Sequence, residues 1–182
     1  FLVVRSRGRR VTIERGGTVE EIEDDPWPVL QGLLRRYSVE QTPGLPPFQG
    51  GALGYWSYDL GRHLESLPSQ AEDDLGLPEM YVGLYDWALA HDGDKGQSYL
   101  FSTGMPEGGE ERARTRLEKV MRRLESAPRD APQSVTEGPE ALRSNFTPET
   151  YRAAVRRIKE YLAAGDVYQV NISQRFEAAF TG

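Results

Sequence analysis

The chain has 182 residues, a formal net charge of −6 and 38% hydrophobic residues, which fits one domain, or one domain plus a piece of another. The negative charge argues against a nucleic-acid or anionic-membrane surface, and the lack of cysteine excludes disulfides, Cys-ligated metals and thiol catalysis. No apolar run approaches the roughly 20 residues that a membrane span needs. Because the sequence begins with Phe1 and not Met, we expect that N-terminal residues are missing from this numbering.

The first predicted elements are a β-hairpin and a helix. Residues 2–4 and 11–13 are apolar strands on either side of a turn at Gly8. Asp25 has the side chain and the position typical of a helix N-cap, and Pro26 follows at the first helical position. The apolar residues that follow recur at helical spacing and predict one apolar stripe on the helix: Leu30, Leu33, Leu34 and Tyr37.

A run rich in glycine and aromatic residues follows a proline-rich linker. Residues 46–65 read Pro-Pro-Phe-Gln-Gly-Gly-Ala-Leu-Gly-Tyr-Trp-Ser-Tyr-Asp-Leu-Gly-Arg-His-Leu-Glu. A glycine inside a regular element costs roughly 0.5–1 kcal/mol relative to Ala, so these glycines predict close backbone approach or unusual dihedrals. We expect a glycine-interrupted strand over residues 49–57 and a short helical turn over 58–65. The glycine spacing matches no phosphate-binding loop, which favours a structural role.

The middle of the chain predicts an acidic loop, a strand pair and a helix. Residues 67–78 are the loop, and residues 81–90 and 97–102 are strands paired through a turn at 92–96. Residues 110–126 form a helix because their apolar residues fall on one stripe: Leu117, Val120, Met121 and Leu124.

A boundary is predicted after this helix. Residues 127–143 contain three prolines and no hydrophobic periodicity, so we divide the chain into a first region (1–126), a linker (127–146) and a third region (147–182). The third region opens with a helix that Thr147 caps and Gly165 ends. The mixture of hairpins and separate helices predicts an α+β fold with antiparallel sheets packed against helices.

Residues 167–176 predict a strand with one polar face. Alternation places four polar side chains on that face, and the sequence alone does not decide whether they meet solvent or line a polar cleft: Gln169, Asn171, Ser173 and Arg175. His63 and His91 have carboxylates nearby in sequence, but no three or four ligands converge, so we expect surface histidines and no metal site. We assign no catalytic residue to this chain.

Two stretches resemble a known family. The pattern Gly-Gly-x-x-Gly-Tyr-x-x-Tyr-Asp over residues 50–59 resembles a signature in the N-terminal half of chorismate-using synthases, namely anthranilate synthase component I and aminodeoxychorismate synthase (para-aminobenzoate synthase) component I. Residues 165–171, Gly-Asp-Val-Tyr-Gln-Val-Asn, resemble the point where these proteins enter their chorismate-binding half. Residues 45–65 and 85–87 are closer to aminodeoxychorismate synthase. The motif residues are Gly50, Gly51, Gly54, Tyr58 and Asp59.

The resemblance implies an activity for a longer protein. Chorismate is aminated with ammonia and Mg²⁺ to 4-amino-4-deoxychorismate for folate synthesis, and a glutamine amidotransferase subunit supplies the ammonia. The metal-binding glutamates and the catalytic lysine belong to the C-terminal half, so we expect this 182-residue fragment to be inactive and its full-length protein to be cytoplasmic.

One position carries over from the resemblance. Water-using relatives have a Lys in the last strand where the amine-using branch has a Gln, here Gln169. The resemblance therefore implies that Gln169 belongs to the wall of the substrate pocket. Two alternatives stay open: anthranilate synthase component I, and a docking or ligand-binding module without chemistry.

Overall fold

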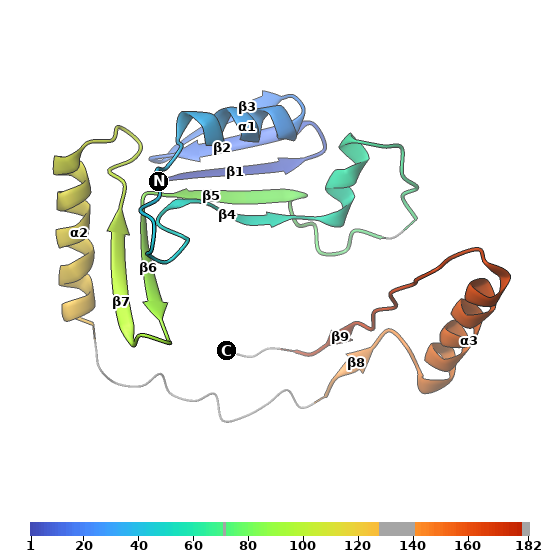
Figure 1. Ribbon diagram of the computed structural model, residues 1–182. Coiled ribbons are helices and arrows are strands. Elements are labelled where there is room, and N and C mark those ends of the chain that lie inside the picture. Colours follow the sequence, from blue (N-terminus) through green and yellow to red (C-terminus); the bar gives the residue numbers. More distant parts are fainter. Residues whose placement is uncertain (71, 128–140, 180–182) are drawn as a thin grey trace. The chain divides into compact units, whose positions relative to one another are not determined.

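The computed structural model describes residues 1–70, 72–127 and 141–179 (Figure 1). Contacts divide the chain into two units, Phe1–Pro128 and Arg129–Gly182. Antiparallel sheets combined with helices confirm the predicted α+β class. In the described parts of the chain, no helix has the length and apolar character of a membrane span.

The first unit is built on a five-stranded sheet in which every neighbouring pair is antiparallel. The strand order is β3-β2-β1-β5-β4, so β3 and β4 are the two edge strands. The predicted hairpin and the predicted glycine-interrupted strand are both confirmed within it. The strands are β1 (Leu2–Arg7), β2 (Arg10–Arg15), β3 (Thr18–Glu23), β4 (Gly51–Trp56) and β5 (Met80–Tyr85).

The edge strand β3 was not predicted from the sequence. Half of its residues are glutamates, a residue type that is depleted in strands. The sequence TVEEIE therefore shows no regular alternation of apolar and polar residues that would predict a strand. The signal that could have revealed it is the pair Gly16-Gly17, whose φ angles of 56° and 84° form the two-residue turn between β2 and β3.

The core lies between one face of this sheet and helix α1 (Pro26–Arg36), which crosses that face in Figure 1. The predicted cap is confirmed, because the Asp25 side chain accepts a hydrogen bond from Trp27 N and Pro26 opens the helix. Leu30 and Tyr37 of the predicted stripe are buried, whereas Leu34 is 40% exposed. The sheet contributes alternate residues from its three interior strands: Leu2 and Val4 of β1, Val11 of β2, and Met80, Val82 and Leu84 of β5.

The predicted pairing with residues 97–102 is confirmed, but residues 81–90 belong to two strands and not to the single strand predicted, because the chain changes sheets at Asp86. β5 ends at Tyr85, and β6 (Trp87–Asp92) pairs with β7 (Gln97–Ser102) in a separate two-stranded sheet. The predicted turn at 92–96 joins them. Helix α2 (Glu110–Glu125) packs beside β7 (Figure 1) and buries Val120, while Met121 and Leu124 of its predicted stripe are each 45% exposed.

The second unit holds helix α3 (Pro148–Ala164), whose predicted start and end are confirmed. Thr147 and Thr150 form a reciprocal capping box, and Gly165 ends the helix with φ of 79°. The predicted strand over 167–176 is wrong. In the described part of the second unit, the strand pairing is that of β8 (Arg143–Ser144) with β9 (Phe176–Glu177). Residues 167–175 alternate between polar and apolar side chains but pair with no described strand. β8 falls inside the predicted linker, most of which lies outside the described residues.

Candidate functional site

The glycine-rich run forms β4 and then a 3-10 turn, η1 (Tyr58–His63), as predicted. Gly50 precedes the strand with φ of 126°, and a Cβ there would lie 2.9 Å from Thr103 Cγ2 and 3.2 Å from the Tyr85 carbonyl oxygen. Gly51 has φ of 112° but open space around it. Both positions therefore favour glycine through their backbone conformation, and only Gly50 also through close packing.

Gly54 is required for a different reason. Its φ is not positive, but a Cβ would overlap the carbonyl oxygen of Tyr81 and lie 2.6 Å from the Cα of Val82. The backbones of β4 and β5 thus approach closely at this position. The predicted close approach is confirmed, and these glycines serve the sheet.

A cavity of about 310 Å³ lies at the N-terminal end of the run. Gln49 is buried in its wall, where its amide accepts from Thr42 N and donates to the carbonyl oxygens of Thr42 and Pro46. The Gln49 side chain therefore holds the proline-rich linker in place. The cavity is lined by Ser38, Val39, Glu40, Thr42, Gln49, Phe101, Ser102, Thr103 and Met105.

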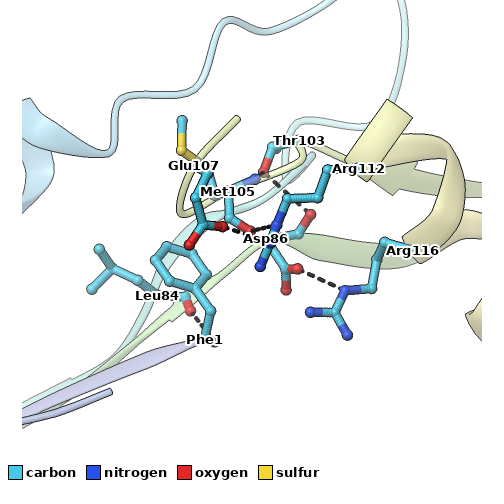
Figure 2. Close-up of polar contacts among 8 residues, drawn as sticks. All are labelled: Phe1, Leu84, Asp86, Thr103, Met105, Glu107, Arg112 and Arg116. Carbon is cyan, nitrogen blue, oxygen red and sulfur yellow. Dashed lines mark hydrogen bonds and ion pairs between the residues drawn. The ribbon is translucent and has the colours of Figure 1, made fainter. Parts of the chain in front are cut away.

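Polar contacts of Asp86 fix one wall of this first cavity (Figure 2). The Asp86 side chain is buried, and its Oδ2 accepts a hydrogen bond of 2.7 Å from Arg116 Nε on α2. The Asp86 carbonyl oxygen accepts from Thr103 N at 2.8 Å and from Thr103 Oγ1 at 3.2 Å. Arg112 donates to the Met105 carbonyl oxygen and pairs with Glu107. Helix α2 thereby holds residues 103–107 against the point where the chain changes sheets.

A second cavity, of about 390 Å³, lies at the C-terminal end of the run. His63 Nε2 is 3.6 Å from Glu79 Oε2, and that oxygen accepts a hydrogen bond of 2.9 Å from Gly8 N. Arg62 pairs with Asp59 at 2.7 Å, so its charge is balanced within η1. The cavity is lined by Gly8, Arg9, Asp25, Arg62, His63 and Glu79.

The contact between His63 and Glu79 connects η1 to the residue that precedes β5. The hydrogen bond from Gly8 N to the same Glu79 carboxylate connects that residue to the β1–β2 turn. Neither cavity brings together a nucleophile and a base oriented by a third group. In the described ranges, no three His, Asp or Glu side chains come together in a group that could hold a metal ion.

Titration shifts occur away from both cavities. The pKa of Asp92 is lowered, first because its carboxylate accepts from the Lys95 main-chain N–H and then because it contacts the Lys95 ammonium. The pKa of Lys95 is raised by the same carboxylate, and Tyr161 and Glu160 raise that of Arg157 on α3. These groups lie at a hairpin turn and on a helix surface. They indicate surface pairs, not a reactive centre.

The sequence-predicted site residues fall in both units. Tyr58 is 92% exposed at the start of η1, beside Asp59 and the glycines of β4. Gln169 is an exposed residue after α3, in the second unit. Its placement in a pocket wall stays a prediction. Asp86 and Arg116 were not predicted, although a lone Asp inside an apolar strand pattern is a signal that could have drawn attention to residue 86.

Comparison with known proteins decides the family. A family described as chorismate binding enzyme matches residues 5–182. The chain belongs to the chorismate-binding enzymes. A crystal structure of anthranilate synthase component I from Streptococcus pneumoniae TIGR4 shares the fold, with a TM-score of 0.71 and 23% identity over 99% of this chain and 42% of that one.

Curated relatives of this chorismate-binding chain carry two different names. Aminodeoxychorismate synthase component 1 is 38% identical in Klebsiella aerogenes and 39% identical in Escherichia coli (strain K12), over 97% and 96% of this chain. Anthranilate synthase component 1 of Acetivibrio thermocellus is 34% identical over 96% of it. The chain spans only 37%, 36% and 38% of the lengths of these relatives. The predicted family membership is thus confirmed.

Proposed function

We propose that this chain is the N-terminal part of an aminodeoxychorismate synthase component 1, which aminates chorismate to 4-amino-4-deoxychorismate. The observation that carries the proposal is the identity to three aminodeoxychorismate synthases, 38%, 39% and 40%, which exceeds the 34–37% identity to five anthranilate synthases. The resemblance of residues 45–65 to aminodeoxychorismate synthases supports it.

In this proposal the described residues supply a scaffold and part of a pocket wall. Mg²⁺, when bound, would assist departure of the chorismate hydroxyl. The described residues bring together no group of three potential ligands, and the proposal places the ligands of the ion elsewhere in the longer protein. A glutamine amidotransferase partner, which the words "component 1" in the relatives' names suggest, would supply ammonia in the cytoplasm.

The direct test is product analysis of the complete gene product. Purified full-length protein is incubated with chorismate, ammonia and Mg²⁺, and products are separated by chromatography with mass detection. The proposal predicts 4-amino-4-deoxychorismate. Anthranilate would favour the synthase of that name instead, and binding of chorismate without turnover would favour a module without chemistry.

The 182-residue chain itself should not consume chorismate under the same conditions. The groups that bind the metal and carry the bond chemistry are proposed to lie outside it. Metal-dependent loss of chorismate above the spontaneous background, in a clean preparation of this chain, would overturn that placement.

Gln169 is proposed to line the substrate pocket of the full-length enzyme. A Gln can hydrogen-bond a polar substrate without moving a proton, whereas a Lys whose pKa is lowered by burial can act as a base toward water. Gln169→Lys should therefore depress amination, permit some attack by water, and change unfolding free energy by less than about 1 kcal/mol.

A second variant controls for the added charge. Gln174 is also exposed and lies in the same segment, so Gln174→Lys introduces the same side chain five residues away. It should leave the product profile unchanged. If neither variant made a hydroxylated product and both aminated chorismate at the wild-type rate, Gln169 would lie outside the pocket.

A further inference from the structure

The two edges of the five-stranded sheet differ sharply in chemistry. Strand β3 carries three glutamates in six residues, and charged side chains protect an edge from pairing with another strand. Strand β4 reads Gly-Ala-Leu-Gly-Tyr-Trp and has neither a charge nor a proline. β3 therefore has the composition of an edge exposed to water, and β4 has the composition of a strand that is paired.

The outer edge of β4 has main-chain groups available for such pairing. Ser57 N donates to the Glu79 carbonyl oxygen at 2.7 Å, which makes this a hydrogen-bonded pair at the end of the β4–β5 ladder. Because such pairs alternate in antiparallel sheets, the N–H and C=O groups of Ala52, Gly54 and Trp56 point away from β5. Among the residues that the structure describes, no strand pairs with this side of β4 (Figure 1).

The face of β4 and β5 that points away from α1 is apolar. Tyr55 and Tyr81 stack with ring centroids 6.2 Å apart, and Tyr85 lies over Gly83. Leu53 beside them is 58% exposed. We call this set, Leu53, Tyr55, Tyr81 and Tyr85, the aromatic face. On the same side of the sheet, β1 and β2 instead present polar residues such as the Arg5–Glu14 ion pair.

The occupant of this surface is indicated by the length of the relatives. This chain spans 37% of the Klebsiella aerogenes protein and 42% of the solved Streptococcus pneumoniae chain, so most of such a protein lies outside the residues seen here. A second copy fits less well, because two chains that each carry a net charge of −6 repel one another.

We propose that the outer edge of β4 pairs with a further strand, supplied by the part of the same protein that follows residue 182, and that this part also covers the aromatic face. Main-chain hydrogen bonds to Ala52, Gly54 and Trp56 would extend the sheet, and the aromatic face would supply the apolar contact. The inference rests on the proposal that the chain belongs to a longer enzyme, and not on which product that enzyme makes.

The test compares the two edges in the full-length protein, purified without any partner. Leu53→Cys reports on β4, and Val19→Cys is a matched control, because Val19 is 54% exposed and lies on the same side of the sheet on β3. Residues 1–182 contain no cysteine, and labelling sites are located by peptide mass spectrometry. Maleimide labelling of Leu53→Cys should be at least about tenfold slower than that of Val19→Cys. Equal rates would overturn the proposal.

A crosslink identifies what covers the surface. A photoreactive benzophenone amino acid replaces Leu53, and the crosslinked peptides are mapped after irradiation. The expected partner is a peptide of the same chain beyond residue 182. Crosslinks to a second copy, to an amidotransferase added afterwards, or to residues preceding Phe1 would each contradict the proposal, as would a gene that encodes nothing after residue 182.

These outcomes are distinguishable from failure of the proposed function. A full-length protein that makes anthranilate while Leu53→Cys is protected would refute the assigned reaction and support the covered edge. A protein that makes 4-amino-4-deoxychorismate while Leu53→Cys labels as fast as Val19→Cys would support the assigned reaction and refute the covered edge.

Discussion

Helices α1 and α3 begin in the same way but differ in what they bury. Each has a proline in its first turn and an N-cap side chain bonded to a main-chain N–H, and α3 adds a reciprocal capping box. α1 buries Leu30 and Pro26 against a sheet. α3 is longer, 17 residues against 11, yet has no buried residue. Good caps therefore define where a helix starts, whereas burial depends on a partner surface.

The largest difference between the two helices should appear when an apolar side chain is removed. Leu30→Ala deletes a buried side chain and should lower the free energy of unfolding by about 2–4 kcal/mol. Ile158→Ala in α3 removes a half-buried side chain and should cost under about 1 kcal/mol. Urea denaturation followed by circular dichroism measures both. Equal losses would mean that α3 is packed as tightly as α1.

Ion pairs sharpen the comparison between buried and exposed groups. Arg116→Met leaves the Asp86 carboxylate buried and unpaired, and should cost about 2–3 kcal/mol in unfolding experiments. Arg114→Met on the same helix is the matched control, because its pair with Glu110 is exposed and should contribute under about 0.5 kcal/mol. A loss at Arg116 no larger than that at Arg114 would show that α2 does not depend on Asp86.

Two glycines of β4 separate steric overlap from backbone conformation. Gly54→Ala forces the backbones of β4 and β5 apart and should cost about 2 kcal/mol. Gly51→Ala meets open space and is disfavoured only by its positive φ, so about 1 kcal/mol is expected. Thermal unfolding of both variants measures the difference. A Gly54→Ala protein as stable as the wild type would show that β4 is loosely held.

Removal of the two N-cap side chains should change the free energy of unfolding least, and the two variants should differ in which measurement detects the change. Asp25→Ala and Thr147→Ala each remove one cap hydrogen bond, worth about 1 kcal/mol. Asp25→Ala should shift the unfolding midpoint of the first unit, because α1 is docked on the core. Thr147→Ala should reduce helicity without moving that midpoint. A shift of the midpoint by Thr147→Ala would couple α3 to the core.

Features set by neighbouring residues could be predicted from the sequence. The caps at Asp25 and Thr147, the turn at Gly8 and the strand-then-turn form of residues 49–65 all follow from local chemistry. The glycines of β4 were expected to permit close backbone approach, and Gly54 does so against β5.

Features set by distant partners could not be predicted. Asp86, where the chain changes sheets, pairs with Arg116 thirty residues later, and nothing in the apolar pattern of residues 81–90 indicates that partner. Residues 167–175 alternate between polar and apolar side chains as a strand would. In that part of the chain, however, the strand that forms is β9, Phe176–Glu177, which pairs with β8. The two cavities, likewise, are lined by side chains from several elements far apart in sequence.

Hydrogen exchange of the 182-residue chain, resolved at single amides, tests the contrast between the two units most directly. Val4 and Val82 lie in central strands and are fully buried, so their amides should exchange slowest. The amides of Val155 and Ile158 in α3 should exchange at least about a hundredfold faster, because that helix can open without disrupting a core. Protection at Ile158 equal to that at Val82 would contradict this account.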